Sequence, residues 1–155
     1  MTDIRVGVVD VYLLHRTEER TRVLTLQRAA VGTRCPLAWE TVHGRIEPDE
    51  RPEQAAVREV DEETGLSIAR LYNVTTQAFY LHGMGAVQVA VAFCAFVDQP
   101  RAPTLGPEHG NAEWLDLHAA RERLAWPRER EALEHIRRLF ATGDAGPLED
   151  VLRVF

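Results

Sequence analysis

The segment that most limits the fold of this chain is residues 44–66, GRIEPDERPEQAAVREVDEETGL. Pro52 suits the first turn of a helix, because the N–H that proline lacks would have no partner there, and Gln54 can supply half of a capping box. Gly65 suits the left-handed conformation in which helices often end. These signals predict a helix over residues 52–64, preceded by a loop.

The last turns of this helix carry four acids: Glu59, Asp61, Glu62 and Glu63. At 100° per residue Glu59, Glu62 and Glu63 share one face, whereas Asp61 points away. Like charges at this spacing destabilise a helix by about 0.2–0.5 kcal/mol per pair, and the helix dipole disfavours anions near its C-terminal end. A solvated acidic face is the simpler interpretation, but only Arg58 offers a positive charge nearby. The pattern therefore predicts that a cation binds along this edge.

The rest of the sequence predicts a sheet that this helix can cover. Segments rich in β-branched and aromatic residues predict strands, and Pro127 opens a second helix with apolar residues on one face. The fold class is therefore α/β, a mixed sheet covered by helices in one domain over residues 1–155. We expect an apolar stripe of the first helix to face the sheet: Ala56, Val57, Val60 and Thr64. The predicted strands are 4–14, 23–28, 37–42, 66–81 and 86–97, with a short strand or helix approach at 113–117, a helical turn at 118–126 and no clear pattern after 140.

Mg²⁺ is the cation that suits such an edge best. It takes carboxylate ligands, keeps several waters and binds substrate phosphates at the same time. Two such ions can activate a water and neutralise an in-line displacement at phosphorus. We therefore expect Mg²⁺ as the cofactor, with Mn²⁺ as a possible substitute.

The motif G-x5-E-x7-R-E-V-x-E-E-x-G-L over residues 44–66 resembles the Nudix box at every defined position. The order of strands and helices around it also resembles the Nudix fold, a mixed β-sheet sandwiched between α-helices. The resemblance implies Mg²⁺-dependent hydrolysis of a phosphoanhydride bond in a nucleoside triphosphate or another nucleoside diphosphate linked to a further group. The stretches AWETVHGRIE and EHGNAEWLD are similar to the dihydroneopterin triphosphate pyrophosphatase and dinucleoside polyphosphate hydrolase branches.

On this resemblance Glu59, Glu62 and Glu63 would be the metal ligands, directly or through water. Gly44 would let the loop backbone approach the metal and the phosphates. Arg58 would hold the carboxylates in place through charge-assisted hydrogen bonds.

Three further residues are assigned by the same resemblance. Glu50 would brace the loop against the helix and could contact the metal indirectly, and Gly65 would cap the helix without a chemical role. Glu108 would be the additional acid that many members carry beyond the box, and it could take a proton from the attacking water or bind another metal. Glu113 fits that role less well, and Glu47 in the loop could also reach a metal.

The substrate-binding residues are the least constrained. Trp39, on the strand that leads to the loop, could stack on a base or pterin ring. Arg28 and Arg45 could contact phosphates, although both are more simply interpreted as solvated surface charges. His43 departs from the glycine common at its position in the family, and it could touch a phosphate or fill space under the loop.

Two other functions remain open. A Nudix domain can be a non-catalytic nucleotide sensor, but sensors often have damaged boxes or an attached DNA-binding domain, and neither is expected here. An isoprenoid diphosphate isomerase shares the fold, but the intact hydrolase spacing argues against it.

Composition limits the partners. The formal net charge of −6 argues against a nucleic-acid groove, which needs basic surface. No stretch approaches the ~20 apolar residues that span a bilayer, and the N-terminus lacks a secretory signal. Cys35 and Cys94 are too few for a disulfide framework. We therefore expect a cytoplasmic protein with a small-molecule partner, and a homodimer is compatible with the resemblance.

Overall fold

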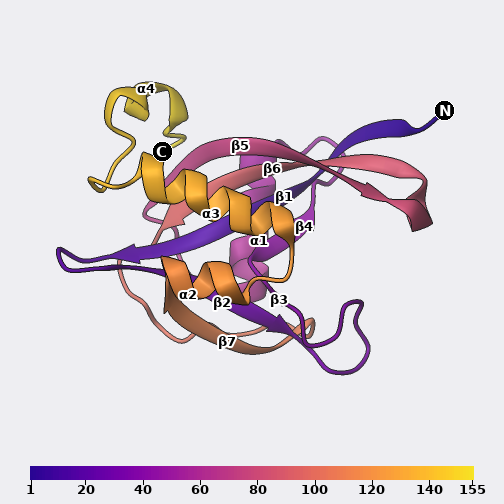
Figure 1. The fold of residues 1–155 in the computed structure, drawn as a ribbon, viewed down its shortest axis with the longest axis horizontal. Helices are drawn as coiled ribbons and strands as arrows, with labels where there is room; N and C mark the ends of the chain where they lie inside the picture. Colours follow the sequence, from indigo (N-terminus) through magenta and orange to yellow (C-terminus); the bar gives the residue numbers. More distant parts are fainter.

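The computed structural model describes residues 1–155 and confirms the α/β prediction, with a mixed sheet between helices (Figure 1). The strands are β1 (Asp3–Arg16), β2 (Thr21–Arg28), β3 (Trp39–Glu40), β4 (Val42–Arg45), β5 (Arg70–Leu81), β6 (Ala86–Phe96) and β7 (His109–Asp116). The helices are α1 (Pro52–Thr64), α2 (Leu117–Arg123), α3 (Pro127–Leu139) and α4 (Glu149–Leu152), with 3₁₀ turns η1 (His82–Met84) and η2 (Gly146–Leu148). None of these helices has the length and apolar character needed to cross a membrane.

The sheet divides at its centre, where neighbouring strands take different partners. The order is β3-β2-β1-β6-β5, with β4 beside β1 and β7 beside β2. Strand β1 is parallel to β6 along its length, but it pairs with β2 only where their hairpin closes. Away from the hairpin, β1 pairs with β4, and β2 pairs with β3 and β7. The single strand expected over 37–42 is therefore two strands, which break at Thr41 as the chain crosses from β2 to β1.

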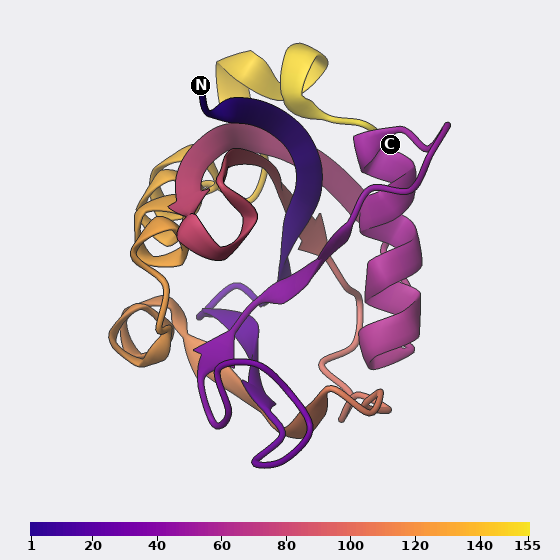
Figure 2. The ribbon, with the colours of Figure 1, turned by 90° about the vertical axis from the view of Figure 1, so that its right-hand side faces the viewer.

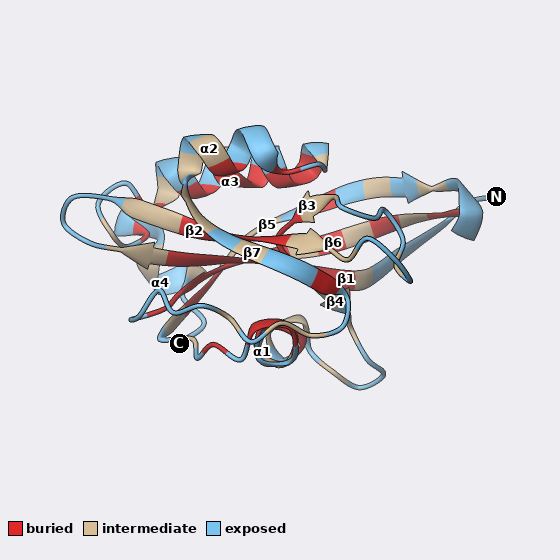
Figure 3. Cartoon of the chain, turned by 90° about the horizontal axis from the view of Figure 1, so that it is seen from below, coloured by how far each residue is buried: buried red, intermediate tan, exposed pale blue.

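Each face of the sheet buries its own apolar cluster. Helix α1 covers one face, and α2 and α3 cover the other (Figure 2). Along β1, Val9, Val11 and Leu13 belong to the α1 cluster, whereas Tyr12 and Leu14 belong to the α3 cluster, as the two-residue period of a strand requires. In Figure 3 the buried residues lie between these layers, and the far end of β1, β5 and β6 projects beyond the helices.

Helix α1 has the bounds that the sequence predicts. The Arg51 N–H donates to the Gln54 side chain at 2.9 Å, and Gly65 ends the helix with φ of 64°. The predicted stripe is wrong at Val57, which is 41% exposed. Val57 lies 100° from Ala56, at the edge of the buried face, and Ala55 is buried on the sheet instead.

The C-terminal segment pairs with the edge of the sheet, although its sequence shows no clear secondary-structure pattern. The Val154 N–H donates to the Leu71 carbonyl at 2.8 Å, and the Leu71 N–H donates to the Phe155 carbonyl at 3.0 Å. These bonds cover one end of the outer edge of β5 and close part of an edge that would otherwise stay open.

Candidate active site

The carboxylates of α1 lie against β4. The apolar face of α1 is buried on the sheet, which fixes the rotation of the helix. Glu59 and Glu63 lie on that side and are each only 8% exposed, whereas the Glu62 side chain is 58% exposed. A Cβ on Gly44 of β4 would lie 1.9 Å from Cδ of Glu59. Glycine at this position therefore lets the Glu59 carboxylate lie directly on the β4 backbone.

Arg58 joins the helix to the loop that precedes it. Its guanidinium binds Glu50 through two hydrogen bonds of 2.8 and 2.9 Å, and it donates to the Arg45 carbonyl at 2.8 Å. It also donates to Glu59 at 2.7 Å and to Glu62 at 3.4 Å. Two-pronged pairing of this kind fixes direction as well as distance. Arg58 therefore sets the positions of two box carboxylates and of the loop together.

Glu50 completes this bracing. Its second oxygen accepts the backbone N–H of Glu47 at 2.9 Å. Hydrogen bonds from Arg58 and then from the Glu47 backbone lower the pKa of Glu50 to about 2. Glu50 is therefore ionised across the working pH range and remains paired with Arg58.

Glu63 has the least satisfied surroundings of the box carboxylates. Its Oε2 is buried and has no hydrogen-bond partner. Burial, followed by the charges of Glu59, Glu40 and Glu108, raises the pKa of Glu63 to about 9. A carboxylate in this position needs either a proton or a nearby cation.

The surroundings of the Glu63 carboxylate indicate whether a divalent cation fits this group. A hard cation would supply the missing positive charge and a partner for the free oxygen of Glu63. No three acidic, histidine or cysteine side chains are close enough in this conformation to form a complete metal-binding group. The available donors nevertheless suit Mg²⁺, because Glu59 and Glu63 offer carboxylate oxygens beside the backbone of Gly44, which carries no side chain of its own.

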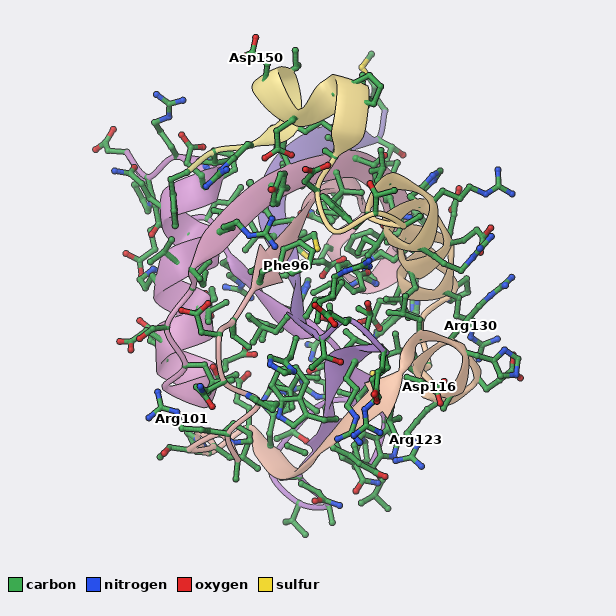
Figure 4. The ribbon with its side chains drawn as sticks, turned by 90° about the vertical axis from the view of Figure 1, so that its left-hand side faces the viewer. Phe96, Arg101, Asp116, Arg123, Arg130 and Asp150 are labelled. Atoms are coloured by element: carbon green, nitrogen blue, oxygen red, sulfur yellow. The ribbon has the colours of Figure 1, made fainter.

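Glu108 lies close to this group although it is far from it in sequence. The loop before β7 passes the C-terminal end of α1, where the Thr104 N–H donates to the Thr64 carbonyl at 2.9 Å. Gly106 lies against Glu62, since a Cβ there would be 3.4 Å from the Glu62 carbonyl oxygen. In Figure 4 the labelled Arg101 marks the same loop beside α1. The structure thus brings Glu108 to the box carboxylates.

Glu40 is an acid of this region that the sequence reasoning missed. It is 4% exposed, and its Oε1 accepts from Arg28 at 2.8 Å and lies 2.9 Å from His109 Nε2. Arg28 is therefore paired in the interior, with 16% of its side chain exposed, and its assignment as a solvated charge is wrong. The sequence did offer one signal for Glu40. It is an acid on the strand that leads to Gly44, at a position where the alternation of side chains along a strand predicts an inward direction.

The two other proposed substrate residues lie apart from the carboxylates. Trp39 is next to Glu40 on β3 and therefore points to the opposite face, where Arg123 of α2 lies 4.7 Å from its ring centre. The Arg45 side chain is exposed, and only its carbonyl joins the Arg58 network.

His43 lies on β4 and turns away from α1. Its Nδ1 is 2.6 Å from Oδ1 of Asp10, a fully buried residue of β1 that also accepts from Arg128 of α3 at 2.8 Å. The sequence reasoning missed Asp10 and Arg128, because their partners come from distant parts of the chain.

Comparisons with known proteins agree with this architecture. The NUDIX domain family matches residues 5–136. The crystal structure of a binary complex of Ap4A hydrolase from C. elegans superposes with a TM-score of 0.76 at 21% identity, over 89% of this chain and 99% of that one. The dihydroneopterin triphosphate pyrophosphohydrolase of E. coli superposes with a TM-score of 0.65 at 25% identity, over 86% and 96% of the two chains.

One sequence relative carries a different name. The octanoyltransferase of Myxococcus xanthus is 36% identical over 98 residues, which is 62% of this chain. The match spans only 28% of the octanoyltransferase. It therefore relates this chain to a minor part of that protein.

Proposed function

The chain belongs to the Nudix family, and on this premise we propose that it is a Mg²⁺-dependent pyrophosphohydrolase. The substrate we propose is a nucleoside triphosphate or another nucleoside diphosphate linked to a further group. The observation that carries the proposal is Glu63, a buried carboxylate with a free oxygen and a pKa of about 9. Such a group keeps its proton in the interior unless a cation takes the place of that proton.

Glu59, Glu62 and Glu63 would hold the metal, with the backbone at Gly44 beside them. Bound there, Mg²⁺ would lower the pKa of a coordinated water and neutralise charge on the phosphates. Mn²⁺ would be an acceptable substitute, because it also prefers oxygen ligands.

The other residues have roles that follow from their contacts. Arg58 fixes Glu59 and Glu62 on the helix and holds Glu50 of the loop, so that the carboxylates keep their spacing when substrate arrives. Glu108 is our choice for the base that takes a proton from the attacking water, because it is an exposed carboxylate beside the group. Water would then attack phosphorus in line, and the second phosphate would leave.

The named relatives suggest which substrates to examine first. The superposed structures are called an Ap4A hydrolase and a dihydroneopterin triphosphate pyrophosphohydrolase. The panel should therefore contain dinucleoside polyphosphates and a pterin triphosphate, together with the common nucleoside triphosphates and ADP-ribose as a nucleoside diphosphate linked to a sugar. Products are followed by phosphorus NMR with Mg²⁺ in ¹⁸O-labelled water, which shows the phosphorus that water attacks.

The matched variants are Glu63→Gln and Asp61→Asn. Mutation of a residue that only supports a metal ligand typically lowers activity about 10- to 100-fold. Glu63 is a proposed ligand itself, so we expect Glu63→Gln to lower kcat by at least about 100-fold. Asp61→Asn removes a charge from the same helix at an exposed position and should keep the wild-type rate. Equal rates for all three proteins would contradict the assignment, and a folded protein that cleaves nothing in the panel would favour the sensor function.

Location and assembly are also proposals. Both cysteines are free thiols, Cys35 exposed and Cys94 buried, which suits a reducing compartment, and we place the protein in the cytoplasm. A homodimer is proposed from the family resemblance alone. Sedimentation at micromolar concentration tests it, and a species of 17.5 kDa would contradict it.

A further inference from the structure

The first residues of β1 form a sheet edge that no other segment covers. Strand β1 pairs with β4 only from Val8 onward, and the loop after β4 leaves the sheet where the Ile46 N–H donates to the Gly7 carbonyl at 2.9 Å. Residues 3–6 therefore pair with β6 on one side and have no strand on the other. This end of the sheet projects beyond the helices (Figure 3). An uncovered edge of this kind is a template for another strand.

One face of this projecting end is apolar and exposed. The side chains that share it come from neighbouring strands: Ile4 and Val6 of β1, Val87 and Val89 of β6, and Ala78 and Tyr80 of β5. Ile4 is 74% exposed, Val6 61% and Tyr80 58%. Val91, two residues beyond Val89, packs on the core under α1, so this face continues that core past the end of its helical cover. Single exposed apolar residues are ordinary, but a contiguous set indicates an interaction surface.

The other face of the same edge carries two charges of opposite sign. Asp3 and Arg5 alternate with Ile4 and Val6 along the strand, so they point to the opposite side of the sheet. The Arg5 guanidinium donates to the Asp3 carboxylate at 3.2 Å, and the side chains of Asp3 and Arg5 are 70% and 53% exposed. Charges of one sign on an edge would repel an identical strand. Because this edge carries both signs, it repels an identical strand in some registers and attracts it in another.

A second copy of the same edge matches these charges in one register. Two identical strands related by a two-fold axis pair antiparallel, with the same surface on both sides. With Ile4 opposite Ile4 of the second copy, each Asp3 lies opposite the Arg5 of the other chain. Each charge then has an opposite charge along its own strand and another across the pair, which favours this register. An axis at Asp3 or at Arg5 would place like charges opposite each other, and an axis between residues would place apolar side chains beside charged ones.

The same register joins the apolar faces of the two copies. The Ile4 side chains meet at the axis, and the apolar residues of β1, β6 and β5 continue from one copy into the other. Pairing is confined to residues 2–6, because β4 occupies the edge from Val8 onward. A standard interface takes about 20–30 residues from each partner. This contact is smaller, so the association should be reversible and depend on concentration.

We propose that the β1 edge over residues 2–6 is the dimer surface of this protein, occupied by the same edge of a second copy in antiparallel pairing with Ile4 at the two-fold axis. The inference gives the proposed homodimer a surface and does not depend on the proposed hydrolysis. Gly44 lies opposite Val9, outside the paired residues, so assembly and hydrolysis can be tested separately.

Charge reversal tests the surface in solution. The wild type should show a monomer–dimer equilibrium in sedimentation from low to high micromolar concentration. Asp3→Arg leaves two positive charges on the edge and Arg5→Asp leaves two negative charges, so each variant alone should weaken the dimer at least about tenfold. An equimolar mixture of the two should dimerise again, because a positive edge then faces a negative one. Glu18→Arg, in the exposed turn at the other end of β1, is the matched control and should dimerise as the wild type does.

The outcomes separate the surface from the homodimer itself. Loss of the dimer in each variant and its recovery in the mixture would support pairing between positions 3 and 5. A dimer of wild-type strength in both variants, or no recovery in the mixture, would overturn this surface and leave a homodimer on another face. A wild type that stays monomeric at every concentration would overturn both the surface and the homodimer, whatever the protein hydrolyses.

A cysteine at the axis tests the register. Directly opposite residues of an antiparallel pair have Cα atoms about 4.5–5.5 Å apart, which a disulfide can span. In a Cys35→Ser background, which removes the exposed thiol, Ile4→Cys should form covalent dimers with a mild oxidant on a non-reducing gel. Val6→Cys, which would lie opposite Thr2 of the second copy, is the matched control and should link far more slowly. Equal linking of the two variants, or none with Ile4→Cys, would overturn the proposed pairing.

Discussion

At the scale of single residues, Glu63 connects burial to function. An ordinary glutamate in water ionises near 4.5, and the pKa of Glu63 is about 9 because of burial and three like charges. The proton that it keeps in the folded state is lost on unfolding. At Glu63 the folded chain therefore binds more protons than the unfolded chain between these two pKa values, and the contribution of Glu63 to stability falls as pH rises through that window.

This gives a prediction for the metal-free protein. With a chelator present, the free energy of unfolding of the wild type should decrease from pH 5 to pH 9, because more of the Glu63 carboxylate must be buried as an anion. Glu63→Gln removes one titrating group and should make that slope shallower, while Glu129 and Glu59, whose pKa values burial also raises, still contribute. Urea unfolding at pH 5, 7 and 9 measures the difference. Asp61→Asn, an exposed neighbour, should retain the wild-type slope, and an equally steep slope in Glu63→Gln would contradict the environment assigned to Glu63.

Residue contacts also show where sequence reasoning stops. The shared face of the box carboxylates is predictable because their spacing on a helix is a local property, whereas their roles come from the family resemblance. Glu40, Asp10 and Arg128 were missed because each acquires its meaning from a partner more than 60 positions away, or from a strand whose register is set by the whole sheet. Periodicity places a side chain on a face, but it does not reveal which charge it will meet.

At the scale of elements, the approach of α1 to β4 depends on Gly44. The helix bounds were predictable, since Pro52, Gln54 and Gly65 act within one turn of the helix ends. The break at Thr41 was not, because it depends on β2 and β1 taking different partners. The Thr41 N–H, which has no strand partner at the break, is accepted by the buried Glu129 carboxylate of α3 at 2.5 Å. The position of this strand boundary is therefore set by tertiary contacts and not by the local sequence.

Gly44→Ala tests how closely the two elements approach. The new methyl group would lie 1.9 Å from Cδ of Glu59, so the carboxylate must leave the position in which Arg58 holds it. Overpacking of this kind costs about 1–3 kcal/mol, and we expect a lower Tm together with a large loss of kcat. Gly83→Ala is the control, because a Cβ there meets nothing within 4 Å. An unchanged Tm and rate in Gly44→Ala would mean that Glu59 has room that the structure does not show.

At the scale of the whole molecule, the divided sheet lets one site draw on both layers. The carboxylates come from the α1 side, while Asp10, His43 and Arg128 come from the α3 side. Strand β4 lies between them, beside β1, and carries Gly44 and His43 as neighbours that face opposite layers. Gly44 therefore contacts the carboxylate of Glu59 on one side of the strand, while His43 contacts the buried Asp10 on the other.

Metal binding should stabilise the whole domain if the carboxylate group is the site. A ligand that binds only the native state at ten times its Kd contributes about 1.4 kcal/mol, which corresponds to about 3–6 °C in Tm for a domain of this size. The increase with Mg²⁺ or Mn²⁺ should be larger at pH 8 than at pH 6, because Glu63 must lose its proton before it can bind a cation. Thermal unfolding of the wild type and Glu63→Gln over a metal titration measures both effects. The same increase in the two proteins, or one independent of pH, would place the cation elsewhere on the acidic surface.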